Sequence, residues 1–246
     1  MSRYDFSAQR LFVEADLATG ARISCTPGQT NYVRNVLRLR AGDEILLFNG
    51  RNGEWRATVG DGPKRGSVLD LGEQTRLQEG GPDVDYLFAP LKRARLDYMV
   101  EKATEMGVAS LRPVLTRRTT PERVNLDRMR ANAIEAAEQC GILRIPDVRQ
   151  PERLERLLLE WDGTRTLVFC DENSDIADPL AALANVKSQP VALLIGPEGG
   201  FDPSERELLL AQRFVIGISL GSRILRADTA AVAALALVNA VAGDWR

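Results

Sequence analysis

Short runs of alternating apolar and polar residues fill the first third of the chain. Five of these runs have the length of a strand, and Gly, Asn or Pro turns separate them. They are RLFVEADL, ARISCT, DEILLFNG, EWRATVGD and GSVLDLG. One segment, TNYVRNVLRLR, instead places Val33, Val36 and Leu37 at helical spacing, which leaves Arg34 and Arg38 on the exposed side. The pattern predicts a small, mostly β barrel that carries one basic helix.

The pattern changes after EQTRLQEGGPD, a polar stretch with the glycine and proline content of a linker. Beyond it, apolar runs such as DYLFAP, RTLVFCDE and PVALLIG alternate with helical patterns such as ARLDYMVEKATEMGV and PSERELLLAQR. This alternation predicts an α/β domain, a parallel sheet with helices on both faces. We therefore expect a barrel domain over residues 1–73, a linker over 74–83 and the α/β domain over 84–246.

The last predicted helix, from Asp228 through TAAVAALALVNAVAG, is apolar almost all round. Such a helix is buried either within its own domain or against a second subunit. The pattern alone leaves both alternatives open.

Composition narrows the class of protein. The 246 residues are 44% hydrophobic and 27% charged, no apolar run approaches a membrane-spanning length, and MSRYDFSAQRLFVEADL does not have the order of a signal peptide. Three cysteines without a CxxC pair favour reduced thiols, so we expect a cytoplasmic protein that does not enter a membrane. The chain contains no histidine, which excludes His-based triads and the common zinc sites. We therefore expect no metal.

Positive charge is locally concentrated although the net charge is −2. The basic stretches are RNVLRLR, KRAR and RPVLTRRTTPER. Local basic stripes on an acidic protein suit recognition of one RNA site, although charge runs are also typical of plain solvated faces.

The stretch LLIGPEGGFDPSE carries an apolar run into a glycine-rich turn at the predicted carboxyl end of a strand. Asp202, Pro203 and Glu205 have the spacing of a capped helix start. Because Glu198 lies in the turn and Asp202 occupies the helix amides, the stretch disfavours a phosphate. A plain tight turn into a capped helix is the alternative to a binding loop.

A second patternless stretch, LGSRILRADTAA, separates the last strand from the last helix. It offers backbone groups flanked by Ile224 and Leu225 to a flat apolar ligand, and we expect Asp228 to cap the final helix. A structural ion pair between Arg226 and Asp228 is an equally good interpretation. On the helix NAIEAAEQCG, Glu135 lies one turn from Gln139, as expected for a solvated face.

Five stretches occur along the chain in one order: VLRLRAGD, VEKATEMGV, EAAEQCG, IGPEGGF and LGSRILRADTA. Together they resemble the bacterial small-subunit ribosomal RNA uridine N3-methyltransferases of the SPOUT class, and the resemblance covers nearly the whole chain. It implies a PUA-like RNA-binding β barrel followed by a SPOUT domain, whose parallel sheet is tied in a trefoil knot. It also implies a homodimer.

The resemblance further implies that S-adenosylmethionine, the methyl donor, binds bent among the backbone loops of the knot. The donor-binding residues carried over are Leu194, Gly196, Gly199, Ile218, Leu220 and Leu225. A donor with a sulfonium cation and no phosphate makes Glu198 favourable in the first loop.

Methylation at N3 of a uridine requires loss of the imide proton, which leaves negative charge on the ring oxygens. Arg226 is the candidate that stabilises this charge. Asp228, Glu135 or Glu138 could accept the proton or orient the base. Asp228 stands where the resembled family usually has glutamate.

The expected substrate is 16S ribosomal RNA in the small ribosomal subunit. The candidate RNA contacts are Arg10, Arg34, Arg38, Lys92, Arg93, Arg117 and Arg118. Two other functions remain open, a SPOUT methyltransferase that acts on another RNA position and a non-catalytic RNA-binding assembly factor. The intact GPEGG and ILRAD loops argue against the second.

Overall fold

The computed structural model describes residues 8–63, 66–120, 123–174, 178–186 and 190–245. The chain divides into two compact units. The first unit comprises Met1–Gly80 with Ala137–Ile145, and the second comprises Gly81–Ala136 with Pro146–Arg246.

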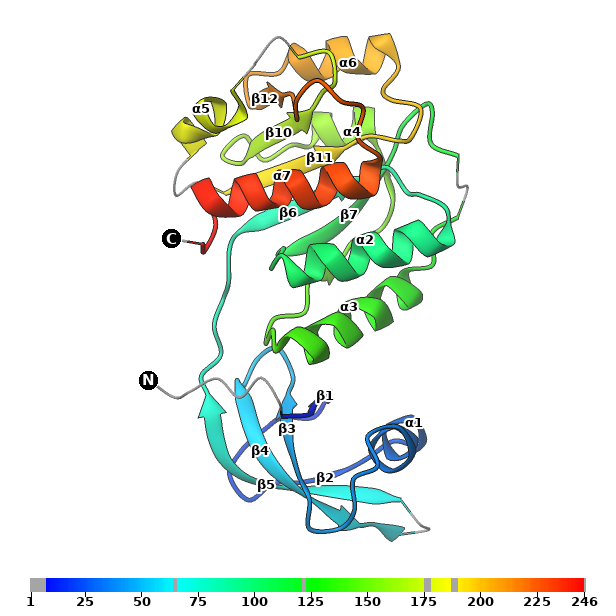
Figure 1. The fold of residues 1–246 in the computed structure, drawn as a ribbon, viewed down its shortest axis with the longest axis vertical. Helices are drawn as coiled ribbons and strands as arrows, with labels where there is room; N and C mark the ends of the chain where they lie inside the picture. The colour runs from blue at the N-terminus through cyan, green and yellow to red at the C-terminus, as the bar shows by residue number, and fades with distance from the viewer. Residues whose placement is uncertain (1–7, 64–65, 121–122, 175–177, 187–189, 246) are drawn as a thin grey trace. The chain divides into compact units, whose positions relative to one another are not determined.

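The first unit is built on one curved sheet with strand order β1-β3-β4-β5-β2 (Figure 1). The strands are β1 (Arg10–Phe12), β2 (Arg22–Ser24), β3 (Glu44–Phe48), β4 (Glu54–Asp61) and β5 (Ser67–Arg76). All pairs are antiparallel except β1 with β3. Alternate residues of these strands, among them Leu47, Ala57 and Leu69, fill an apolar core, which confirms the predicted β architecture.

The predicted basic helix is shorter and more irregular than its spacing suggested. It consists of α1 (Pro27–Asn31), opened by a Thr26 capping box, and a π-helical turn η1 (Tyr32–Val36). In the π-helical turn the Leu37 amide bonds the Tyr32 carbonyl, so residues three apart no longer share a face. Val33 is therefore buried whereas Val36 is 58% exposed, which corrects the prediction that both face the core.

A short segment from later in the chain completes the first unit. The end of helix α3 (Leu126–Cys140) and the residues after it cluster with the barrel. There the Glu138 carboxylate accepts a hydrogen bond from the Phe12 amide at 2.8 Å, and Arg76 Nη1 donates to the Gly141 carbonyl at 2.8 Å. Strand β5 also continues to Arg76, into the stretch predicted as linker. Periodicity could not reveal this return of the chain, since the bonded partners lie far apart in the sequence.

The second unit contains a parallel sheet with strand order β12-β10-β11-β6-β7-β8, and β9 also pairs with β7. Its strands are β6 (Val84–Phe88), β7 (Ser110–Leu115), β8 (Asp147–Val148), β9 (Glu152–Arg153), β10 (Thr166–Cys170), β11 (Val191–Ile195) and β12 (Val215–Ile218). Its helices, besides most of α3, are α2 (Arg93–Glu105), α4 (Leu154–Leu159), α5 (Pro179–Leu183), α6 (Pro203–Leu210) and α7 (Ala227–Val241).

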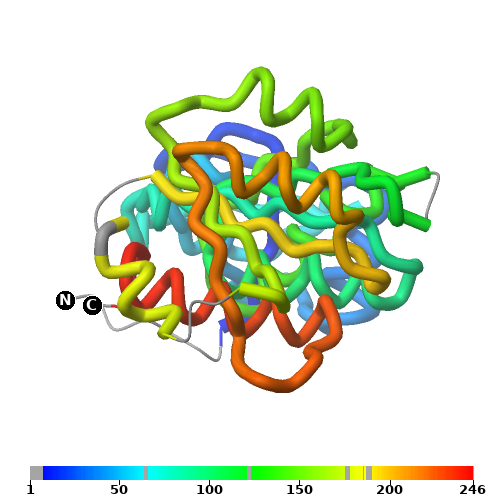
Figure 2. The backbone as a smooth tube through the Cα atoms, turned by 90° about the horizontal axis from the view of Figure 1, so that it is seen from above, coloured from blue at the N-terminus to red at the C-terminus, as the bar shows by residue number. Residues whose placement is uncertain are grey.

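Helices cover both faces of this sheet, as the alternating pattern predicted. On one face, Leu87 and Phe169 pack with residues of α4 and α6. On the other face, α7 packs against both β11 and α2. Figure 2 shows α6 and α7 on opposite sides of the strands. Since successive strand residues alternate, Tyr86 and Cys170 point to the α7 face. Loops after β10 and β11 meet the segment before α7 at the carboxyl ends of the strands.

Candidate active site

A cavity of about 390 Å³ lies at the carboxyl ends of β10 and β11. Three loops form it: the end of β10, the GPEGG loop, and residues 224–227 before α7, with Arg95 of α2 added from the side. We call it the donor cavity. Its lining residues are Arg95, Cys170, Glu172, Ile195, Gly196, Pro197, Glu198, Gly200, Phe201, Ile224, Leu225, Arg226, Ala227 and Ala230.

The GPEGG loop owes its shape to glycine and to the helix cap beyond it. A Cβ on Gly196 would lie 2.4 Å from the Phe201 ring, whose edge packs on Phe169 with centroids 4.9 Å apart. Gly200 has φ of +69°, which glycine adopts without strain. The α6 capping box forms as predicted. The Asp202 carboxylate accepts a hydrogen bond from the Ser204 amide, and the Glu205 carboxylate accepts one from the Asp202 amide. The loop is thus held open and its backbone lines the cavity.

Two charged groups in the donor cavity neutralise each other. The Glu198 carboxylate pairs with Arg95 from the first turn of α2. On the far side of the loop, Arg118 Nη1 donates to the Gly199 carbonyl at 2.9 Å, and the Glu205 carboxylate accepts from the Arg117 amide at 2.8 Å. Arginines from other elements, Arg95 and Arg118, therefore hold the GPEGG loop through its Glu198 side chain and its Gly199 carbonyl.

Cys170 lines the donor cavity but offers no thiolate. Burial raises the pKa of its thiol to about 12, so the group is protonated near neutral pH. A nucleophilic role for this cysteine would need a lowered pKa.

Tyr86, on the same face of the sheet, was not predicted as part of the site. Its hydroxyl is buried and has no hydrogen-bond partner among the described residues. Burial, followed by the nearby Cys170 and Asp228, raises the pKa of the hydroxyl well above its ordinary value, so it stays protonated. A single tyrosine in an apolar strand carries no sequence signal that separates it from a core residue.

The predicted cap of the last helix is wrong by two positions. Helix α7 begins at Ala227 with Arg226 as its N-cap residue, and Asp228 lies in the first turn, where its carboxylate bonds the Thr229 amide. The ion pairs of the described residues do not include one between Arg226 and Asp228. Arg226 instead is exposed and lines the donor cavity.

The predicted donor residues are distributed over the cavity and the strands behind it. Gly196 and Leu225 line it, and Gly199 stands in the same loop. Leu194 and Ile218 are fully buried near the ends of β11 and β12. The partly exposed Leu220 begins the segment that leads to Leu225. Residues that the sequence did not single out are Arg95, Cys170, Glu172 and Phe201, which only strand order brings to this place.

The other predicted catalytic residues lie apart from the cavity lining. Asp228 is partly buried two positions beyond Arg226. Glu135 is exposed on α3. Glu138 belongs to the first unit and caps the Phe12 amide, so its contacts are structural.

Two predicted RNA contacts are occupied by structural interactions. Arg10 is 4% exposed, and its Nε lies 2.9 Å from the buried Glu54 carboxylate. Arg34 donates to Ser67, to the Gly60 carbonyl and to Asp61. A guanidinium held in this way is not free to meet a phosphate, and sequence could not show these distant acceptors.

The remaining predicted RNA contacts are accessible. Arg38, Lys92 and Arg93 are exposed, and the side chains of Arg117 and Arg118 are 59% and 46% exposed. The last two stand beside the GPEGG loop of the donor cavity.

Comparison with known proteins decides the family. A family model described as an RNA methyltransferase domain matches residues 79–239, and one described as an RNA methyltransferase PUA domain matches residues 26–71. The chain belongs to this RNA methyltransferase family. The predicted PUA-like first domain and parallel methyltransferase domain are thereby confirmed.

Members of the family with known names match along nearly the entire chain. The chain is 30% identical over 232 residues to Ribosomal RNA small subunit methyltransferase E of Rickettsia conorii, covering 94% of both chains. It is 33% identical over 239 residues to the protein of the same name from Synechocystis sp., covering 95% of this chain and 78% of the relative. A methyltransferase from Legionella pneumophila, solved with bound SAM, matches with a TM-score of 0.83 and 29% identity, covering 96% of this chain and 99% of the other.

The lining of the donor cavity is largely apolar side chains and backbone. Among the described residues no group of three His, Cys, Asp or Glu could hold a metal ion, and no helix there is long and apolar enough to cross a membrane. The donor cavity combines apolar walls, such as Phe201 and Ile224, with the backbone of the GPEGG loop.

Proposed function

We propose that this protein is a methyltransferase that uses S-adenosylmethionine to methylate N3 of a uridine in 16S ribosomal RNA of the small subunit. One observation carries the proposal: Gly196 of the GPEGG loop and the adjacent Leu225 and Arg226, which lie in a separate later segment, line one cavity in a chain of the RNA methyltransferase family. The names of the relatives support the RNA substrate. We place the reaction in the cytoplasm, where small subunits are assembled.

The donor cavity supplies what the methyl donor needs. The backbone of Gly196 and the side chains of Ile224 and Leu225 provide flat surfaces for adenine. Glu198 adds a carboxylate to the cavity lining, where it pairs with Arg95 of α2. When bound, S-adenosylmethionine supplies an electrophilic methyl group. We propose Leu194, Gly199, Ile218 and Leu220 as further donor-binding positions, through the backbone of their loops.

Arg226 is proposed as the catalytic cation. Its exposed guanidinium lies at the rim of the donor cavity, where it can meet a uracil oxygen as negative charge develops after loss of the N3 proton. Two residues are candidates for the proton acceptor or the group that orients the base. Asp228 lies two positions after Arg226, in the first turn of α7, whereas Glu135 belongs to α3. Neither residue lines the cavity, so both assignments rest on the family resemblance.

The chain is further proposed to act as a homodimer and to carry the trefoil knot of its class. Half-buried Ala233, Leu237 and Val241 repeat every four residues along a stripe of α7 beside its buried residues. An apolar stripe of this kind is what a dimer interface requires. The strand order β12-β10-β11 supports the knot, because the chain must return from β12 across the ends of β10 and β11 to reach α7.

The decisive experiment incubates the purified protein with S-adenosylmethionine and small subunits that lack the modification, and then maps the methylated nucleotide by mass spectrometry. We expect one N3-methyluridine. Methylation of a ribose hydroxyl or of another base would overturn the N3 assignment. Heat on titration with the donor but no methylation of any RNA would favour the assembly factor.

Arg226→Ala tests the catalytic assignment. We expect turnover to fall by about 10²–10³-fold, as when a charge-stabilising donor is removed, while donor affinity stays within about twofold. Arg223→Ala is the matched control, since Arg223 is exposed in the same segment but does not line the cavity. Normal turnover of Arg226→Ala would remove this residue from the mechanism.

A further inference from the structure

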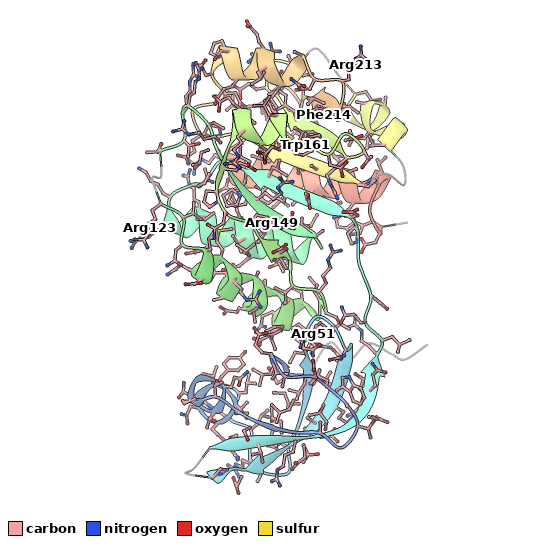
Figure 3. The ribbon with its side chains drawn as sticks, turned by 180° about the vertical axis from the view of Figure 1, so that it is seen from behind. Arg51, Arg123, Arg149, Trp161, Arg213 and Phe214 are labelled. Carbon is pink, nitrogen blue, oxygen red and sulfur yellow. The ribbon has the colours of Figure 1, made fainter. Side chains whose placement is uncertain are left out.

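The second unit contains another cavity, of about 820 Å³, that shares no lining residue with the donor cavity. It lies beside β7, on the face of the sheet that carries α4. Four arginines line it: Arg112 of β7, Arg149 of the β8–β9 connection, Arg153 of β9 and Arg156 of α4. We call it the arginine cavity. Arg149 is labelled in Figure 3.

The arginines outnumber the carboxylates in the cavity. Asp85 and Glu152 are the two acidic lining residues. Glu152 lies 3.4 Å from Arg156, and Asp85 lies 3.4 Å from Arg112. Two further carboxylates pair with these arginines from outside the lining, Asp147 with Arg149 and Glu160 with Arg156. The cation left to attract an anion into this concave surface is therefore Arg153, which is exposed.

The four guanidinium groups differ in how firmly they are held. Arg112 is fixed between Asp85 and the Trp161 ring, whose centroid is 5.6 Å away, and Trp161 itself stacks on Phe214 (Figure 3). Arg149 pairs with Asp147 at 2.9 Å in a setting where both are about 60% exposed. Among the described residues, Arg153 has no ion-pair partner, and it is exposed. The cavity therefore has one rigid cation and others that can turn toward a ligand.

Basic residues connect this cavity with the donor cavity. Arg118 bonds the Gly199 carbonyl of the GPEGG loop, and its neighbour Arg117 lies 3.9 Å from Glu155 of α4. Glu155 is flanked in sequence by Arg153 and Arg156 of the arginine cavity. An RNA backbone that passed beside the GPEGG loop would thus meet Arg117 and Arg118 on its way to the arginine cavity.

We propose that the arginine cavity binds the phosphodiester backbone of the substrate RNA beside the target nucleotide. The inference rests on the proposed function, which it extends by a second RNA site on the methyltransferase unit. Guanidinium groups bind phosphate oxygens in a fork geometry. Arg117 and Arg118, which lie outside the lining, extend the exposed arginines toward the GPEGG loop, which favours a polymer over a free nucleotide.

The test compares two charge reversals in the full-length protein, Arg153→Glu and Arg213→Glu. Both residues are exposed arginines of the second unit, but Arg213 does not line the arginine cavity (Figure 3). Affinity for protein-free 16S rRNA is measured at several salt concentrations. We expect Arg153→Glu to weaken binding roughly tenfold and to reduce the slope of log K against log salt by about 0.7 for each lost phosphate contact. Arg213→Glu should change affinity less than about twofold.

Titration with S-adenosylmethionine and a melting curve accompany both variants. Donor binding and thermal stability should equal those of the wild type, because neither residue touches the donor cavity or the core. Failure of the wild type to bind or use the donor would refute the proposed function, while the RNA comparison would still report on the cavity.

Three results would overturn the proposal. Unchanged RNA affinity of Arg153→Glu would show that the cavity does not meet RNA. Equal losses in both variants would show only a general charge effect. A loss seen on intact subunits but absent on protein-free rRNA would assign the cavity to a ribosomal protein.

Discussion

Gly196 and Gly199 stand three residues apart in one loop, yet their surroundings differ. A side chain on Gly196 would run into the Phe201 ring at 2.4 Å, and that ring is packed in the core. A side chain on Gly199 would meet only the Arg118 Cδ atom, at 3.9 Å. The first glycine is required by packing, whereas the second leaves room for a methyl group.

Gly196→Ala should therefore displace Phe201, lower the free energy of unfolding by about 2 kcal/mol and weaken donor binding at least about tenfold, since the loop lines the donor cavity. Gly199→Ala should cost less than about 0.5 kcal/mol. Chemical denaturation and calorimetric titration with S-adenosylmethionine measure both effects. Equal stability of the two variants would contradict the steric explanation.

At the scale of elements, one carboxylate joins two helices of the second unit. Asp97 of α2 accepts from Arg128 Nε at 2.8 Å and Nη2 at 2.7 Å, and from Asn132 at 2.8 Å. Both donors belong to α3. The hydrogen bond from Arg128 is the main cause that lowers the pKa of Asp97 below its ordinary value.

A lowered pKa in the folded state means that the stabilisation is complete above the unfolded-state pKa, roughly 3.9, and is lost as the pH falls through the folded value. Asp97→Asn should reduce the free energy of unfolding by about 1 kcal/mol at pH 7. The difference from wild type should shrink below about pH 4, where both chains are neutral at this position.

Urea denaturation at pH 7 and at pH 3 measures this pH dependence. Asp244→Asn, at an exposed position near the C-terminus, is the control and should change little at either pH. A deficit of Asp97→Asn that is the same at both pH values would mean that packing, and not charge, joins the helices.

At the scale of the molecule, the proposed dimer rests on helix α7. Its inward residues, such as Ala231 and Leu235, are buried in the second unit, while Leu237, beside this buried stripe, is half-buried. The sequence left open whether this helix is buried within its domain or against a second subunit. The structure shows that it packs on its own sheet with one side, and the half-buried stripe beside that side supports the proposed dimer.

The wild type should sediment as a dimer of the 27.1 kDa chain. Leu237→Arg should shift it to monomer because a buried, unpaired cation is costly at an interface. Leu210→Arg, a similar change at an exposed leucine of α6, should leave the dimer intact. Monomeric wild type, or equal dissociation of both variants, would refute α7 as the interface.

The sequence alone predicted the alternation of short apolar strands and helices. It also predicted the GPEGG and ILRAD loops and the Asp202 cap. These features are local, because each depends on residues within one or two turns of chain. Strand neighbours, the buried partners of Arg10 and Arg34, and the joining of residues 137–145 to the first unit depend on contacts between distant segments. Hydrophobic periodicity states which face of an element is buried but not what covers it, so only the tertiary structure could assemble the donor cavity and disclose the arginine cavity.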